Sequence, residues 1–119
     1  ICFIDDPECA LGEARRVIRE GGDLVMAFID RKSPLGKSLE TMKSENRFYR
    51  HARFFSVEEL VSMLGNHGFE VAEVLQTLID PDAKTPEKPV KGHGQGSFVV
   101  IRATKVKMPV SQKSGSNTE

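Results

Sequence analysis

The stretch Arg15–Phe28, RRVIREGGDLVMAF, decides the fold class of this 119-residue chain. It opens with cationic side chains, which stabilise the negative C-terminal end of a helix. Gly21-Gly22 then ends the helix, because glycine adopts a positive φ at little steric cost. The apolar run Leu24–Ile29 follows without polar alternation, as is typical of a strand covered on both faces of a parallel sheet. The sequence therefore predicts a helix followed directly by a buried central strand.

Capping residues predict where two helices begin. Asp6 can accept hydrogen bonds from free N–H groups, and the proline after it fits the first helical position, so a helix is expected over Pro7–Ile18. Ser56 and Glu59 have the spacing of a capping box, in which each side chain bonds the backbone of the other. This pair predicts a second helix, which ends at Gly68.

Two further apolar segments, Val71–Leu78 and Ser97–Ala103, are predicted to be strands. The polar segment Asp30–Arg53 is long for a simple connection and is expected to contain a short helix over Lys37–Ser44. Segment Asp80–Gly96 is expected to be a loop, because it holds three prolines and three glycines. The alternation of helices and strands indicates an α/β protein.

The composition excludes several classes of partner. Lys plus Arg and Asp plus Glu number 17 each, so the basic excess expected of a nucleic-acid-binding protein is absent. No apolar run reaches the roughly 20 residues that cross a bilayer, so no membrane partner is expected. The two cysteines form no disulfide framework, which favours a cytoplasmic protein. The three histidines lie far apart, without metal-ligand spacing, so no metal site is expected.

Several short motifs follow one another in a recognisable order. They are Asp6-Pro7, Arg16–Gly22 (RVIREGG), Phe55–Leu60 (FSVEEL), Leu64–Phe69 (Leu-x-x-x-Gly-Phe) and the two closing strands. In this order they resemble the C-terminal half of class I S-adenosylmethionine-dependent methyltransferases, and most of all the small-molecule group called type 11. The resemblance covers roughly residues 1–104.

The resemblance implies a partial Rossmann-like sheet that contains the last three strands of the family. The final strand, Ser97–Ala103, would run antiparallel between Leu24–Ile29 and Val71–Leu78, which would be parallel to each other. Residues 1–104 would be the C-terminal part of a methyltransferase domain, and residues 105–119 a polar, disordered tail. The family's glycine-rich cofactor loop after its first strand is absent, so this chain alone is expected to bind S-adenosylmethionine weakly or not at all.

The resemblance also implies a set of site residues. Ile1, Cys2 and Phe3 would lie near the cofactor, although the first and third of these also fit a plain core. Asp30 and Arg31 would lie near the methyl acceptor as catalytic residues, because ligands gather at the carboxyl ends of strands in open α/β sheets. The alternative is a solvated pair, in which the carboxylate only caps the turn that follows.

His93 is a third candidate catalytic residue, in the segment GHGQG at 92–96. Glycines there could let the loop approach a ligand closely, but no helix follows as it would in a phosphate-binding loop. An aromatic cluster beside the long loop is either core packing or an acceptor pocket; its members are Phe48, Tyr49, Phe54 and Phe55.

The function expected from the resemblance is methyl transfer from S-adenosylmethionine to a small-molecule acceptor. Two alternatives stay open: a truncated module without catalysis, and one half of a split enzyme whose partner chain supplies the cofactor loop. The isolated chain is also expected to self-associate, because Leu24–Ile29 would be an uncharged edge strand without its missing neighbour.

Overall fold

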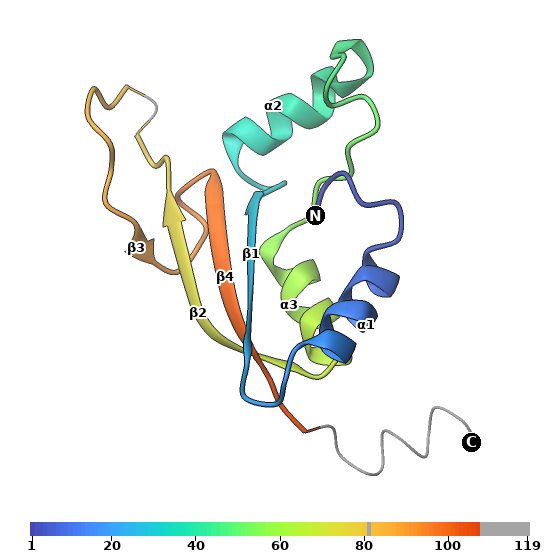
Figure 1. Cartoon of the computed structure of the whole chain (residues 1–119). Coiled ribbons are helices and arrows are strands. Elements are labelled where there is room, and N and C mark those ends of the chain that lie inside the picture. The colour runs from blue at the N-terminus through green and yellow to red at the C-terminus, as the bar shows by residue number, and fades with distance from the viewer. Residues whose placement is uncertain (81, 108–119) are drawn as a thin grey trace.

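The computed structural model describes residues 1–80 and 82–107, which form a four-stranded sheet with helices beside it (Figure 1). The spatial order of the strands is β1-β4-β2-β3. Their bounds are Asp23–Ile29 for β1, Phe69–Thr77 for β2, Val90–Lys91 for β3 and Phe98–Lys105 for β4. Each neighbouring pair is antiparallel, so β1 and β2 run in the same direction on either side of β4. The α/β class and the predicted place of the closing strand are confirmed.

The helices begin where the capping residues predict. Their bounds are Pro7–Val17 for α1, Pro34–Met42 for α2 and Val57–Asn66 for α3, with a 3-10 turn η1 at Lys43–Glu45. The Asp6 carboxylate accepts the N–H of Cys9 at 3.0 Å. Both hydrogen bonds of the Ser56–Glu59 capping box are present. The short helix α2 begins three residues before its predicted start, because the Ser33 hydroxyl caps it and a proline fills its first position.

The core lies on one face of the sheet, where α1 and α3 pack (Figure 1). Helix α3 contributes four residues to this core cluster, more than any other element, and two of them, Leu60 and Leu64, are fully buried. Beneath them lie Val99 and Ile101 of the central strand β4, which are also fully buried. Side chains of α3 and β4 thus belong to one buried core cluster.

The prediction that the first strand is covered on both faces is wrong for the residues described. Met26 and Phe28 are buried beneath the helices, whereas Val25 is 61% exposed on the other face. The reason is that α1 and α3 both belong to the same core cluster, on one side of the sheet. On the outer face Arg102 lies 3.5 Å from a carboxylate oxygen of Asp23 on the neighbouring strand.

Two boundaries differ from the predicted ones because of long-range hydrogen bonds. Strand β4 continues to Lys105, whose backbone bonds Gly21 and Gly22 at 3.0 and 2.8 Å, so the strand passes the predicted domain end at residue 104. The predicted loop at 80–96 contains the short strand β3, which pairs with β2. The predicted disordered tail, beyond residue 107, lies outside the described residues.

Candidate functional site

Asp30 follows β1 directly and is buried, with 4% exposure. Its N–H donates to the carbonyl of Ser97 at 2.9 Å, and its carbonyl accepts from the N–H and the hydroxyl of Ser33 at 3.0 and 2.7 Å. Its carboxylate Oδ1 accepts the N–H of Lys32 at 3.0 Å. The predicted catalytic residue therefore helps to hold the turn between β1 and α2, at the carboxyl end of the strand.

Arg31, the neighbouring candidate, reaches across to α3. Its guanidinium lies 3.1 Å from Glu59 Oε1, and both side chains are about two-fifths exposed. The pKa of Glu59 is lowered from its usual value, first by the backbone N–H of Ser56 and also by the nearby guanidinium. This ion pair ties the end of β1 to the start of α3, so Arg31 is already engaged within the chain.

The extended segment Arg53–Phe55 joins the two predicted sites. The carbonyl of Phe55 accepts the N–H of Arg31 at 3.0 Å, in a parallel bridge between Asp30 and Phe55. At the other end of the segment, the N–H of Arg53 donates to the carbonyl of Cys2 at 2.7 Å. Figure 1 shows the N-terminus beside the carboxyl end of β1. The residues predicted to lie near the cofactor and those predicted to lie near the acceptor are therefore bonded to the two ends of one short segment, Arg53–Phe55.

The predicted cofactor residues lie in an aromatic and apolar setting. Ile1 packs against the core cluster and Cys2 is half-buried. Phe3 is 59% exposed and stacks on Tyr49, with ring centroids 6.0 Å apart. The Tyr49 ring lies 5.9 Å from that of Phe54, which is buried.

The predicted aromatic cluster is only partly confirmed. Phe54 and Phe55 belong to the core, with 4% and 2% exposure, whereas Phe48 is 76% exposed. The exposed ring of Phe3 also stacks on Tyr49 of this cluster. The sequence did not predict this contact, because the two residues are far apart along the chain.

These residues could hold one part of S-adenosylmethionine, the cofactor that the resemblance implies. A half-exposed aromatic surface at Phe3 and Tyr49 suits the adenine ring, because aromatic rings stack favourably. The ribose hydroxyls and the methionine carboxylate need polar partners. Within the predicted set Ile1–Phe3, the carbonyl of Cys2 is already bonded to Arg53.

The glycine-rich segment that contains His93 builds a turn between β3 and β4. The Oε1 atom of the buried Gln76 accepts the N–H groups of Gln95 and Gly96 at 2.9 and 2.7 Å. A Cβ at Gly96 would lie 2.3 Å from the carbonyl oxygen of Thr77, so no larger residue fits there. These N–H groups serve the protein itself, which removes them as donors for a phosphate or carboxylate ligand.

The His93 side chain is exposed. The pKa of Glu58 is lowered mainly by its backbone hydrogen bond, with smaller contributions from Lys32 and from His93.

A cavity of about 280 Å³ opens where β2 ends and α2 begins. Leu35, Leu78 and Ser97 contribute to its lining, which is mainly apolar. Leu78 has a φ of +60°, a left-handed conformation that is strained for a leucine. Strained residues cluster at binding sites. The carbonyl of Ser97, which lines the cavity, also accepts the backbone N–H of Asp30. No sequence signal indicated this cavity.

Residues 1–80 and 82–107 hold neither a cluster of metal ligands nor a membrane-spanning helix. In that part of the chain no three His, Cys, Asp or Glu side chains come together to hold a metal ion. Likewise, no helix within it is long and apolar enough to cross a membrane.

No family model matches the chain, whereas individual proteins do. The uncharacterized protein MJ1123 of Methanocaldococcus jannaschii is 38% identical over 105 residues, which are 87% of this chain and 51% of that protein. The uncharacterized protein Rv2003c of Mycobacterium tuberculosis is 34% identical over 82 residues, 68% of this chain and 29% of that protein. The chain thus spans about half the length of the first relative and less than a third of the second.

Solved structures identify the class of fold. A crystal structure from Thermotoga maritima, described as a SAM-dependent methyltransferase and possible histamine N-methyltransferase, matches with a TM-score of 0.83 and 46% identity. The match covers 87% of this chain and 51% of that one. A SAM-dependent methyltransferase from Methanosarcina mazei matches in fold alone, with a TM-score of 0.55 and 17% identity over 88% of this chain and 55% of that one. The described residues therefore have the fold of part of a Rossmann-like methyltransferase.

Proposed function

We propose that this chain is the substrate-side, C-terminal portion of a S-adenosylmethionine-dependent methyltransferase of the type 11 kind, which acts on a small-molecule acceptor. The observation that carries the proposal is the similarity to the Thermotoga methyltransferase, at 46% identity over 87% of the chain. Identity at this level over most of the chain, together with a common fold, supports a common reaction class.

The geometry at the carboxyl ends of β1 and β2 supports an acceptor site there. The cavity beside Leu35 and Leu78 is close in size to pockets that hold small ligands, which begin at about 300 Å³. Asp30 does not line this cavity, but its backbone N–H bonds the carbonyl of Ser97, which does, and its carboxylate accepts the Lys32 N–H. A carboxylate in this place can orient an acceptor or take its proton, which is the help that methyl transfer needs from a protein.

The cofactor, when bound, supplies an electrophilic methyl group. In this chain Phe3 and Tyr49 would contact its adenine ring, and Ile1 and Cys2 would lie beside it. The partners of the ribose and of the carboxylate would come from polypeptide outside this chain. The acceptor to try first is histamine, because the Thermotoga protein is described as a possible histamine N-methyltransferase.

The test is an assay of the chain co-expressed with the segment of the Thermotoga protein that lies outside the match. Transfer of a labelled methyl group to histamine or to another small amine, dependent on this chain, is expected. Asp30→Asn should lower turnover at least tenfold, which corresponds to about 1.4 kcal/mol of barrier. A complex that binds S-adenosylmethionine yet methylates no small molecule would instead indicate a non-catalytic module.

A further inference from the structure

Strands β3 and β4 pair with β2 from opposite sides, so the chain between them has to cross β2 (Figure 1). Gln76 of β2 pairs with a residue of each strand, which places the crossing at this residue. The crossing segment consists of residues 92–97 and is here called the strap. It lies directly on β2, since a Cβ on Gly96 would be 2.3 Å from the carbonyl oxygen of Thr77.

The Gln76 side chain points to the core face of the sheet. Gln76 lies directly opposite Val99 in the antiparallel pair of β2 and β4, and residues in such a pair point to the same face. Val99 is fully buried in the core cluster, and Gln76 is only 4% exposed. A buried amide needs hydrogen-bond partners, because leaving it unpaired costs free energy.

The strap supplies most of these partners. The Oε1 atom of Gln76 accepts the backbone N–H groups of Gln95 and Gly96 at 2.9 and 2.7 Å. Its Nε2 atom donates to the carbonyl of Lys91, the residue before the strap, at 3.4 Å. One buried side chain thus holds both ends of the crossing, and the strap passes β2 on the core face.

The last residue of the strap, Ser97, reaches the cavity of the proposed acceptor site and contributes to its lining. The carbonyl of Ser97 accepts the backbone N–H of Asp30 at 2.9 Å, and its own N–H donates to the carbonyl of Leu78 at 3.3 Å. Leu78 lines the same cavity. A displacement of the strap would therefore move the cavity wall and the turn at Asp30 together.

We propose that Gln76 is a positioning residue of the acceptor site: its amide fixes the strap, and the strap fixes Ser97 and the turn at Asp30. The role in methyl transfer rests on the proposed function, whereas the contact between Gln76 and the strap can be tested without it. Gln76→Leu keeps a similar size but removes the acceptor, so two N–H groups of the strap lose their partner. The cavity wall then loses its fixed position, and the acceptor binds more weakly.

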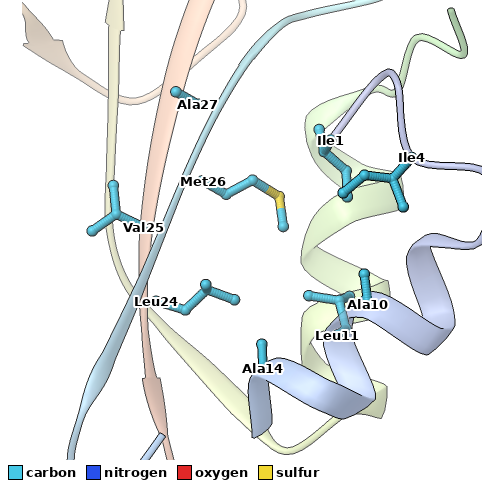
Figure 2. Close-up of a pocket in the computed structure, with 9 residues that line it drawn as sticks. All are labelled: Ile1, Ile4, Ala10, Leu11, Ala14, Leu24, Val25, Met26 and Ala27. Carbon is cyan, nitrogen blue, oxygen red and sulfur yellow. The ribbon is translucent and has the colours of Figure 1, made fainter. Parts of the chain in front are cut away.

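Amide hydrogen exchange of the 119-residue chain tests the contact itself. Gln76→Leu should speed exchange at Gln95, Gly96 and Asp30 by roughly tenfold or more, because their hydrogen bonds open locally. Gln76→Glu keeps an Oε1 atom that can accept both N–H groups, so it should restore the protection. Met26, which lies in the middle of β1 and points toward α1 (Figure 2), reports unfolding of the whole chain and should exchange as in the parent.

Two further variants separate the strap from general damage to the fold. Gly96→Ala forces the strap away from Thr77 and leaves the Gln76 amide in place, so it should also speed exchange at Asp30. Gln95→Ala is the matched control, because it keeps the backbone N–H that Gln76 binds, and it should change nothing.

Methyl transfer to histamine by the complex with the Thermotoga segment tests the role in the reaction. Gln76→Leu should raise the KM for histamine roughly fivefold or more, with a smaller change in kcat, and Gln76→Glu should restore it. The proposal is overturned if Asp30 exchanges as in the parent in both Gln76→Leu and Gly96→Ala, or if Gln76→Glu is as impaired as Gln76→Leu. An unchanged KM in Gln76→Leu also overturns it. A complex that methylates no small molecule contradicts the proposed function, and the exchange at Asp30 then decides whether Gln76 positions the turn.

Discussion

Asp30 combines a structural contact with a candidate chemical role, and two substitutions separate them. Asp30→Asn keeps an Oδ1 atom that can accept the Lys32 N–H, so the stability of the chain should change little. Asp30→Ala removes this acceptor and should lower the free energy of unfolding by about 1 kcal/mol. Urea denaturation of both variants measures the difference. Equal destabilisation by both would show that the charge itself holds the turn.

Gly36 allows α2 to begin directly against the end of β1. A Cβ on this residue would lie 2.0 Å from the carbonyl oxygen of Asp30, which is backbone and cannot easily move. Gly36→Ala should therefore cost about 1–3 kcal/mol, as overpacking does. Gly12→Ala in α1 is the matched control, since no atom lies within 4 Å of its Cβ, and it should stabilise the chain by roughly 0.5–1 kcal/mol. A tolerated Gly36→Ala would refute this packing.

At the residue scale, the sequence predicted which side chains are candidate site residues. It could not predict which contacts fix those side chains in the folded chain. The glycines around His93 suggested a loop near a ligand, yet the N–H groups of the loop bond Gln76, about twenty residues earlier in the chain. Likewise the bridge between Asp30 and Phe55 depends on two segments that meet only in the folded chain. Side-chain partners this distant leave no local pattern.

At the scale of elements, helices and strands with strong local signals were predictable. Helix ends depend on residues that are neighbours in the sequence, such as the N-caps Asp6 and Ser56 and the glycines that follow each helix. These ends lie close to where they were predicted. Strand β3 was not predictable, because only its pairing with β2 makes two exposed residues a strand. The coverage of β1 was mispredicted, since an apolar run cannot show how many faces the rest of the chain covers.

The capping box of α3 gives a pH-dependent contribution to stability. The pKa of Glu59 is lowered from 4.5, first by the backbone N–H of Ser56, so the ionised carboxylate stabilises the folded chain. This contribution is complete above about pH 4.5 and is lost as the pH falls through the lowered pKa. Glu59→Gln keeps an acceptor without the charge, so the parent should be the more stable at neutral pH.

Thermal unfolding of the parent and of Glu59→Gln from pH 7 to pH 3 measures this contribution. The advantage of the parent should shrink on acidification. Ser56→Ala, which removes the other half of the box, should cost about 1 kcal/mol at every pH. An advantage of the parent that does not vary with pH would contradict the role given to the charge.

At the scale of the whole molecule, the order and direction of three strands followed from the resemblance and are confirmed by the sheet. One face of β1 stays exposed at Val25, and an apolar pocket lies between β1 and α1 (Figure 2). The shape of this region could not be predicted from the sequence, because it depends on how α1 packs beside β1 in the folded chain.

The most direct test of the central claim is a calorimetric titration of S-adenosylmethionine into the purified 119-residue chain, and then into its complex with the Thermotoga segment. We propose that this chain supplies the acceptor side of the enzyme and that, on the cofactor side, Phe3 and Tyr49 would contact only the adenine ring. Weak or no binding is predicted for the chain alone, and clear binding for the complex, with the segment alone as control. Low-micromolar binding by the chain alone would contradict the claim.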